Sequence, residues 1–108
     1  DETAVLQARP DFTALLNFEA RGIILTAPGY RSDFISRFFC PAVGVPEDPV
    51  TGSAHCVLIP YWSSMLGKKE LHARQLSKRG GELWCRDEGE RVTISGRAAL
   101  YLEGTIMI

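Results

Sequence analysis

The segment VPEDPVTGSAHCVLIPYWSSML, residues 45–66, decides the fold of this chain. Its second half places apolar residues at the spacing of one helix face, namely Ala54, Val57, Leu58, Tyr61, Trp62, Met65 and Leu66. This periodicity predicts a helix that begins after a cap at Thr51 or Ser53 and ends at Gly67. A helix with so apolar a face needs a broad surface to pack against.

The chain before this segment is predicted to hold a short helix and two strands. Proline and aspartate at positions 10 and 11 open a helix over residues 11–19, where apolar residues recur near helical spacing. Residues 23–27 are rich in β-branched side chains and residues 33–40 in aromatic ones, so both are expected to be strands. Residues 44–52 contain two glycines and two prolines, which predicts a loop.

The chain after the helix has the alternation typical of β-structure. A strand over residues 71–77 would place four side chains on one face, those of Leu71, Ala73, Gln75 and Ser77. Residues 82–86 and 91–95 flank the turn sequence DEGE, which predicts a hairpin. Residues 98–108 are expected to form one or two further strands.

These elements together predict a single α+β domain over residues 1–108. About six antiparallel strands accompany one long helix, and the pattern suggests a curved sheet or barrel wrapped around that helix at its centre. The chain of 108 residues is 45% hydrophobic and 23% charged, which is ordinary for a globular domain and argues against disorder.

Composition also narrows the classes of function. The net charge of -1 leaves no basic surplus to neutralise phosphates, so a nucleic-acid partner is not expected. No apolar run reaches the roughly 18–20 residues of a membrane span, so no membrane partner is expected either.

The cysteines and histidines do not form a recognisable site. Cys40, Cys56 and Cys85 are odd in number and widely spaced, which favours reduced thiols in the cytoplasm over a disulfide framework. The histidines, His55 and His72, have no metal-ligand spacing, so no metal site is expected. The cysteines are interpreted as buried structural thiols more readily than as nucleophiles, and His55 as a helix-surface or cap-adjacent residue more readily than as a base.

The start of the long helix is where chemistry is most plausible. Glu47 and Asp48 precede it directly, and Gly52 and Ser53 lie in its first turn, where backbone amides without intrahelical partners gather. Such a helix start binds anions, so a substrate carboxylate could dock there with Asp48 placed for proton transfer. The residues alone leave a second reading open, because acidic residues before a helix also stabilise its dipole and Thr51 is an ordinary cap.

The motif EDPVTGSAH at residues 47–55, followed by PYW at residues 60–62, resembles the signature of the phenazine-biosynthesis (PhzF-like) family. The resemblance extends upstream through RFFCP at residues 37–41 and downstream through LGK at residues 66–68 and RGGEL at residues 79–83. It covers essentially residues 34–104, and the chain is similar to the C-terminal half of these proteins.

The resemblance implies a diaminopimelate epimerase-like fold, with two similar halves that each wrap a curved antiparallel sheet around a central helix. It implies an isomerase without metal or organic cofactor, which moves protons on a small carboxylate substrate by general acid–base chemistry. Asp48 corresponds to a proton-shuttling aspartate of the motif, and Gly52 and Ser53, beside Thr51, to residues that hold the substrate carboxylate.

One departure from the family pattern makes enzymatic activity of the chain alone an open question. The family's other acid–base groups, a glutamate and a histidine of the first half, have no counterpart in this chain, and His55 belongs to the helix motif instead. We therefore expect either a missing N-terminal half or a homodimer that imitates the two-half arrangement. The alternative function is a non-catalytic half-domain that acts as a dimerisation or protein-interaction module.

Overall fold

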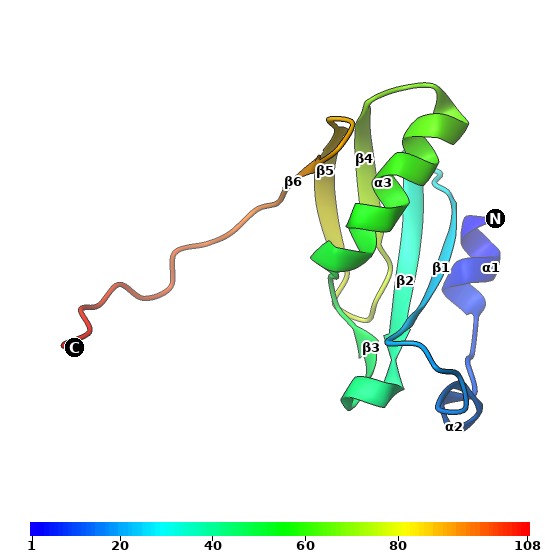
Figure 1. The fold of residues 1–108 in the computed structure, drawn as a ribbon, viewed down its shortest axis with the longest axis horizontal. Helices are drawn as coiled ribbons and strands as arrows, with labels where there is room; N and C mark the ends of the chain where they lie inside the picture. The colour runs from blue at the N-terminus through cyan, green and yellow to red at the C-terminus, as the bar shows by residue number, and fades with distance from the viewer.

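A six-stranded sheet in the order β1-β2-β4-β5-β6 forms the body of the chain, as seen in a computed structural model that describes residues 1–108. The remaining strand, β3, stands outside this order and pairs with β2. The elements in chain order are α1 (Glu2–Gln7), α2 (Phe12–Leu15), β1 (Ile23–Pro28), β2 (Phe34–Cys40), a 3-10 turn η1 (Pro41–Val43), β3 (Val45–Asp48), α3 (Gly52–Leu66), β4 (Glu70–Gln75), β5 (Gly81–Asp87) and β6 (Val92–Ser95). The α+β class predicted from the sequence is confirmed (Figure 1).

The central strand β2 organises the sheet, since it pairs with three other strands. It is antiparallel to β1 and to β3, but parallel to β4 through Phe34↔Ala73 and Ser36↔Gln75. The expectation of a purely antiparallel sheet is therefore wrong. The physical reason is that α3 carries the chain from one end of the sheet back to the other, and such a crossover places the next strand parallel.

The long helix α3 lies across one face of the sheet (Figure 1). It begins at Gly52 and ends at Gly67, whose φ of 65° is the left-handed conformation that ends helices. Its buried residues are Ala54, His55, Leu58, Ile59, Trp62 and Ser63. Trp62 stacks on Phe34 of β2, and its indole N–H donates to the hydroxyl of Thr26 over 2.9 Å.

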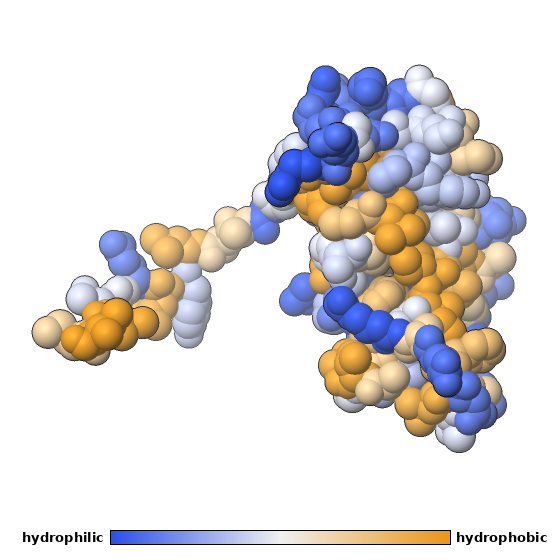
Figure 2. Space-filling model, viewed as in Figure 1, coloured by the Kyte–Doolittle hydropathy of each residue, from blue (hydrophilic) through white to orange (hydrophobic).

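The opposite face of α3 is apolar and exposed. Val57, Tyr61 and Met65 are 64%, 51% and 63% exposed, although the helical periodicity predicted that they would be buried. Figure 2 shows this apolar surface along α3 on the side that faces the viewer. In this chain the sheet covers only one side of the helix, so the helix is flanked by the sheet and not enclosed by it.

The opposite face of the sheet is covered in part by α1, an element that sequence reasoning did not foresee. Asp1 caps this helix by accepting from the backbone N–H of Ala4 over 2.8 Å, and Val5 packs with Ala27 and Ile35 in a small second core. The N-terminal segment is thereby held against β1 and β2.

Two expectations about segments before α3 are also corrected by the structure. The helix predicted over residues 11–19 is only Phe12–Leu15, because Leu16 and Phe18 remain 54% and 60% exposed and meet no core that would extend it. The loop predicted over residues 44–52 contains β3, whose Glu47 and Asp48 pair with β2.

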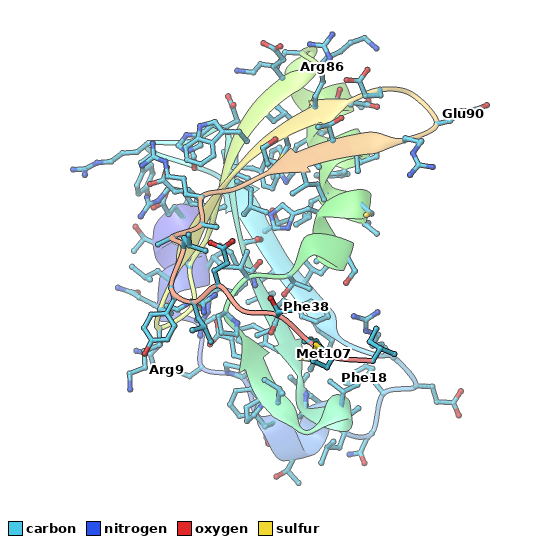
Figure 3. All side chains as sticks on the ribbon, turned by 90° about the vertical axis from the view of Figure 1, so that its left-hand side faces the viewer. Arg9, Phe18, Phe38, Arg86, Glu90 and Met107 are labelled. Atoms are coloured by element: carbon cyan, nitrogen blue, oxygen red, sulfur yellow. The ribbon has the colours of Figure 1, made fainter.

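The strands predicted over residues 98–108 are absent. This segment extends away from the body, with Leu100 and Tyr101 85% and 98% exposed, because no strand of the chain lies beside it to complete a ladder (Figure 1). The hairpin of β5 and β6 is confirmed, and Glu90 lies at its turn (Figure 3). No helix has the length and apolarity needed to cross a bilayer.

Candidate active site at the start of α3

The stretch from Glu47 to Pro49 is held in place by the side chains of Arg37, in β2, and Ser77, which follows β4. Arg37 of β2 donates two hydrogen bonds to the carboxylate of Glu47, of 2.7 and 2.9 Å, and its remaining donors reach carbonyls at the end of α1. The bond to Glu47 raises the pKa of Arg37 above its ordinary value, with burial opposing that effect. Ser77 donates to the carbonyl of Pro49 over 2.8 Å. Glu47 and Pro49, shortly before α3, are thus each fixed by a side chain from another part of the chain.

Close packing under the loop restricts it further. A Cβ on Gly81 would lie 2.3 Å from a methyl carbon of Val50, so only glycine allows β5 to approach the loop at this point. Val50 packs against the main core, which includes Leu83 two residues along the same strand. The loop therefore rests directly on the sheet.

Thr51 is the N-cap residue of α3, and it is 5% exposed. Its side chain makes no capping hydrogen bond to the helix, contrary to the usual role of threonine at this position. The hydroxyl donates instead to Oδ2 of Asp48 over 2.5 Å. Asp48 and Thr51 are thus brought together as a hydrogen-bonded pair, and the first amides of α3 are left without a side-chain cap.

Gln75 of β4 lies beneath this pair and is 1% exposed. Its Oε1 accepts from the backbone N–H of Thr51 over 2.8 Å, and its Nε2 donates to the carbonyl of Asp48 over 2.9 Å and to the hydroxyl of Thr51 over 3.0 Å. The side-chain amide of Gln75 therefore accepts one hydrogen bond and donates two, all with Asp48 and Thr51 as partners.

The junction between β3 and α3, residues 48–53, faces solvent on one side. Gly52 and Ser53 are exposed, and a Cβ built on Gly52 would meet no atom within 4 Å. Arg21 donates to the hydroxyl of Ser53 over 3.2 Å, which adds a positive charge beside the uncapped amides. Free amides, the helix dipole and a guanidinium all favour an anion at this position.

His55 is buried in the core, so its interpretation as a helix-surface residue is wrong. Its ring is 0% exposed, and Nδ1 donates to the carbonyl of Thr51 over 2.7 Å, while Nε2 has no partner. Burial lowers the pKa of His55, with the bond to Thr51 acting against the effect. The imidazole therefore stays neutral and links the first turn of α3 to the residue before it.

The cysteines divide into two groups. Cys40 and Cys85 are buried, as predicted, and burial raises the pKa of Cys85 to about 11. Burial, and then the charge of Asp48, raises the pKa of Cys40. Cys56 is exposed on the first turns of α3, so its interpretation as a buried thiol is wrong. No three side chains of the His, Cys, Asp and Glu types gather in a way that would hold a metal ion.

A hollow of about 930 Å³ lies on the chain, but Asp48, Gly52 and Ser53 do not line it. It is lined by residues that include Arg74, Trp84 and Arg97 from β4, β5 and the start of the C-terminal segment. The chemical groups described above therefore form an exposed junction and not a closed pocket within this chain.

Four residues of the junction were foreseen from the sequence, Asp48, Thr51, Gly52 and Ser53, and the structure places them in one short stretch from the end of β3 to the start of α3. Gln75 and Arg21 were not foreseen as site residues. A signal existed for Gln75, since it is a polar residue on the buried face of a strand whose neighbours on that face are Leu71 and Ala73. Nothing in the sequence distinguishes Arg21 from the other exposed arginines.

The chain is an α+β domain in which a carboxylate is held beside a helix start that has no side-chain cap. Residues 1–104 match the family model described as phenazine biosynthesis-like protein, PhzC-PhzF. The chain belongs to this family.

The proteins that are similar to this chain are longer than it. An uncharacterized isomerase of Pseudomonas aeruginosa is 61% identical over 107 residues, which are 99% of this chain and 41% of that protein. The human phenazine biosynthesis-like domain-containing protein is 57% identical over 96 residues, 82% of this chain and 33% of that protein.

The crystal structure of a phenazine biosynthesis protein of the PhzF family from Enterococcus faecalis superposes with a TM-score of 0.91 at 45% identity, covering 100% of this chain and 42% of that one. The chain thus spans between about a third and about two fifths of the length of these relatives. Because the match covers the whole of this chain, it supports the fold described above.

Proposed function

We propose that the chain carries one wall of the active site of an isomerase that moves protons on a small carboxylate substrate without a metal or organic cofactor. Asp48 transfers the proton, and the amides of Gly52 and Ser53 hold the substrate carboxylate. The observation that carries the proposal is the hydrogen bond from Thr51 to Asp48, because it places a carboxylate directly beside helix amides that no side chain caps.

The names of the relatives support an isomerase at the level of class, since the similar protein of Pseudomonas aeruginosa is called one. They give no support to the alternative, a non-catalytic interaction module. Asp48 has one carboxylate oxygen engaged by Thr51 and no hydrogen bond to the other, which leaves Oδ1 available to take a proton from a substrate.

The rest of the site is proposed to come from outside these 108 residues. A proton moved from one carbon to another needs groups that face the substrate from a second side, and the exposed junction provides only one side. The remaining part of a longer protein, or a second subunit, would supply the opposite wall.

The same missing part is proposed to cover α3. The helix is apolar on both faces, and Val57, Tyr61 and Met65 remain exposed in this chain. Helices of that kind are normally buried all round. In the longer protein we propose that the sheet continues around α3, which then becomes the central helix of a barrel, as in the diaminopimelate epimerase-like fold.

Substitution of Gly52 tests the proposed anion site. Because a Cβ at this position meets no atom within 4 Å, Gly52→Ala leaves the fold intact but adds a methyl group where the substrate carboxylate is proposed to bind. Binding of small carboxylates would be followed by the NMR shifts of the amides of residues 52–54, with Gly96→Ala as the matched control at another open glycine. We expect Gly52→Ala alone to weaken binding; equal binding by both variants would contradict the site.

A further inference from the structure

The hydrogen bonds of Gln75 have a direction that can be assigned without seeing hydrogens. The side-chain oxygen and nitrogen of glutamine look alike in a structure, so their assignment normally rests on the partners. Here the partners are decisive, because the backbone N–H of Thr51 can only donate and the backbone carbonyl of Asp48 can only accept. Oε1 must therefore face Thr51 N, and Nε2 must face the carbonyl of Asp48.

This orientation determines where the hydroxyl proton of Thr51 goes. The second hydrogen of Nε2 points at Oγ1 of Thr51 over 3.0 Å, so the hydroxyl accepts from Gln75. Its own proton is then free, and Oδ2 of Asp48, at 2.5 Å, is the acceptor that remains. Two hydrogen bonds therefore point the same way, from the Gln75 amide to the Thr51 hydroxyl and from that hydroxyl to the Asp48 carboxylate. Each bond in such a series strengthens the next.

Gln75 is also rigidly placed. It is paired with Ser36 of β2 on one side and with Gly81 of β5 on the other, in the interior of the sheet. Its side chain is 1% exposed, so breaking the bonds would leave polar groups buried without water to replace them. The sheet therefore fixes the position of Gln75, and the hydrogen bonds of Gln75 fix the orientation of the loop before α3.

We propose that Gln75 is a positioning residue of the site, and that through the hydroxyl of Thr51 it holds the carboxylate of Asp48 in one orientation with Oδ1 free for proton transfer. The role in catalysis rests on the function proposed above. The orientation of the hydroxyl does not, and it can be measured by itself in the 108-residue chain.

The first measurement uses the wild-type chain. In NMR spectra at low temperature, the hydroxyl proton of Thr51 is expected to give a slowly exchanging signal with a nuclear Overhauser contact to Asp48. The exposed Thr105 serves as the control and should show no such signal. A Thr51 hydroxyl proton that exchanges as fast as that of Thr105 would overturn the proposal, whether or not any variant folds.

The second measurement uses Gln75→Glu, which keeps an oxygen for Thr51 N but removes the donor to the hydroxyl. The hydroxyl of Thr51 can then turn toward Glu at position 75, and the side chain of Asp48 is expected to change from one rotamer to several in three-bond couplings. Gln7→Glu makes the same chemical change at an exposed position and should leave Asp48 in one rotamer. One unchanged rotamer in a folded Gln75→Glu chain would contradict the role of Gln75.

The third measurement connects the orientation to activity in a full-length or paired form of the protein. Thr51→Val removes the hydroxyl at nearly constant shape, and Thr51→Ser restores it. A misplaced reacting group costs on the order of 100-fold in rate, so kcat should fall by about that factor in Thr51→Val, with KM little changed, and recover in Thr51→Ser. Equal kcat in Thr51→Val and Thr51→Ser would overturn the role in catalysis. Absence of isomerase activity in the wild type would instead count against the proposed function, and would leave the NMR results standing.

Discussion

Oδ2 of Asp48 accepts a hydrogen bond of 2.5 Å from the hydroxyl of Thr51, the N-cap residue of α3. The bond diverts the threonine from its usual role as a helix cap, since the cap makes no side-chain bond to the helix amides. One interaction therefore has two consequences. It orients the carboxylate, and it leaves the first amides of α3 free for an anion.

The buried imidazole of His55 predicts a specific dependence of stability on pH. Its pKa in the folded chain is lowered from 6.5 by burial, so the unfolded chain takes up a proton first as the pH falls. The free energy of unfolding should decrease as the pH falls below about 6.5, by up to about 1.4 kcal/mol per pH unit, until the folded histidine is protonated.

Urea unfolding at a series of pH values between 5 and 8 would measure this effect, and His55→Gln should remove it. His72→Gln is the matched control, because it changes the partly exposed histidine that lies 3.0 Å from Glu82. If His55→Gln and wild type lose stability in parallel, the buried neutral histidine is not the cause.

The thiols should differ in reactivity by their exposure. Cys56 is exposed, whereas Cys40 and Cys85 are buried and the pKa of Cys85 is about 11. A thiol reagent at pH 8 should modify one cysteine rapidly and the other two only in denaturant. Cys56→Ser should abolish the rapid phase, and Cys85→Ser should leave it unchanged. A rapid phase that persists in Cys56→Ser would show that a buried thiol is accessible.

Substitution of Gly81 should destabilise the chain through the loop before α3. A Cβ at this position would lie 2.3 Å from Val50, so either the loop or β5 must move in Gly81→Ala. Overpacking of this kind costs about 1–3 kcal/mol. Gly96→Ala is the control, since its Cβ would meet no atom within 4 Å. Urea unfolding midpoints should separate the two variants, and equal midpoints would contradict the close packing of the loop on the sheet.

The exposed face of α3 should make the isolated chain self-associate. Val57 and Met65 are 64% and 63% exposed on a helix that has an apolar second face. Light scattering after size exclusion should show dimers or larger species for the wild type, and the double variant Val57→Lys and Met65→Lys should be monomeric.

A control variant with the same added charge, Thr13→Lys and Thr105→Lys, should still associate, because both positions are exposed and distant from α3 in the sequence. A wild-type chain that is monomeric at all concentrations would show that this face does not drive association. It would also count against the homodimer that we propose as one source of the opposite wall.

The parts of the fold that sequence reasoning predicted well depend on local patterns. The helix from residue 52 to Gly67 follows from its apolar spacing and a glycine with φ of 65° at its end, and the hairpin of β5 and β6 from a turn sequence between alternating strands. The family motif brought Asp48, Thr51, Gly52 and Ser53 together for the same reason, since these residues are neighbours in the sequence.

The parts that were missed depend on pairings between distant residues. The parallel register of Ser36 with Gln75 and the pairing of Phe39 with Glu47 leave no periodic trace in the sequence. Thr51 looked like a helix cap because threonine usually is one, and only the position of Gln75 beneath it shows why its hydroxyl turns to Asp48. Residues 98–108 are rich in apolar side chains and were predicted to form strands, but a strand forms only where a partner strand exists.

Exchange of hydrogen with heavy water tests the role of Asp48 most directly. A full-length or paired form of the protein would be incubated in heavy water with a panel of small carboxylates, and deuterium uptake at carbon would be followed by NMR and mass spectrometry. Asp87→Asn is the matched control, because it makes the same change near the other end of α3, where Asp87 bonds to the backbone of Lys69. We predict that wild type and Asp87→Asn incorporate deuterium and that Asp48→Asn does so at least about 100-fold more slowly. Equal incorporation by Asp48→Asn and wild type would contradict the proposal that this carboxylate moves the proton.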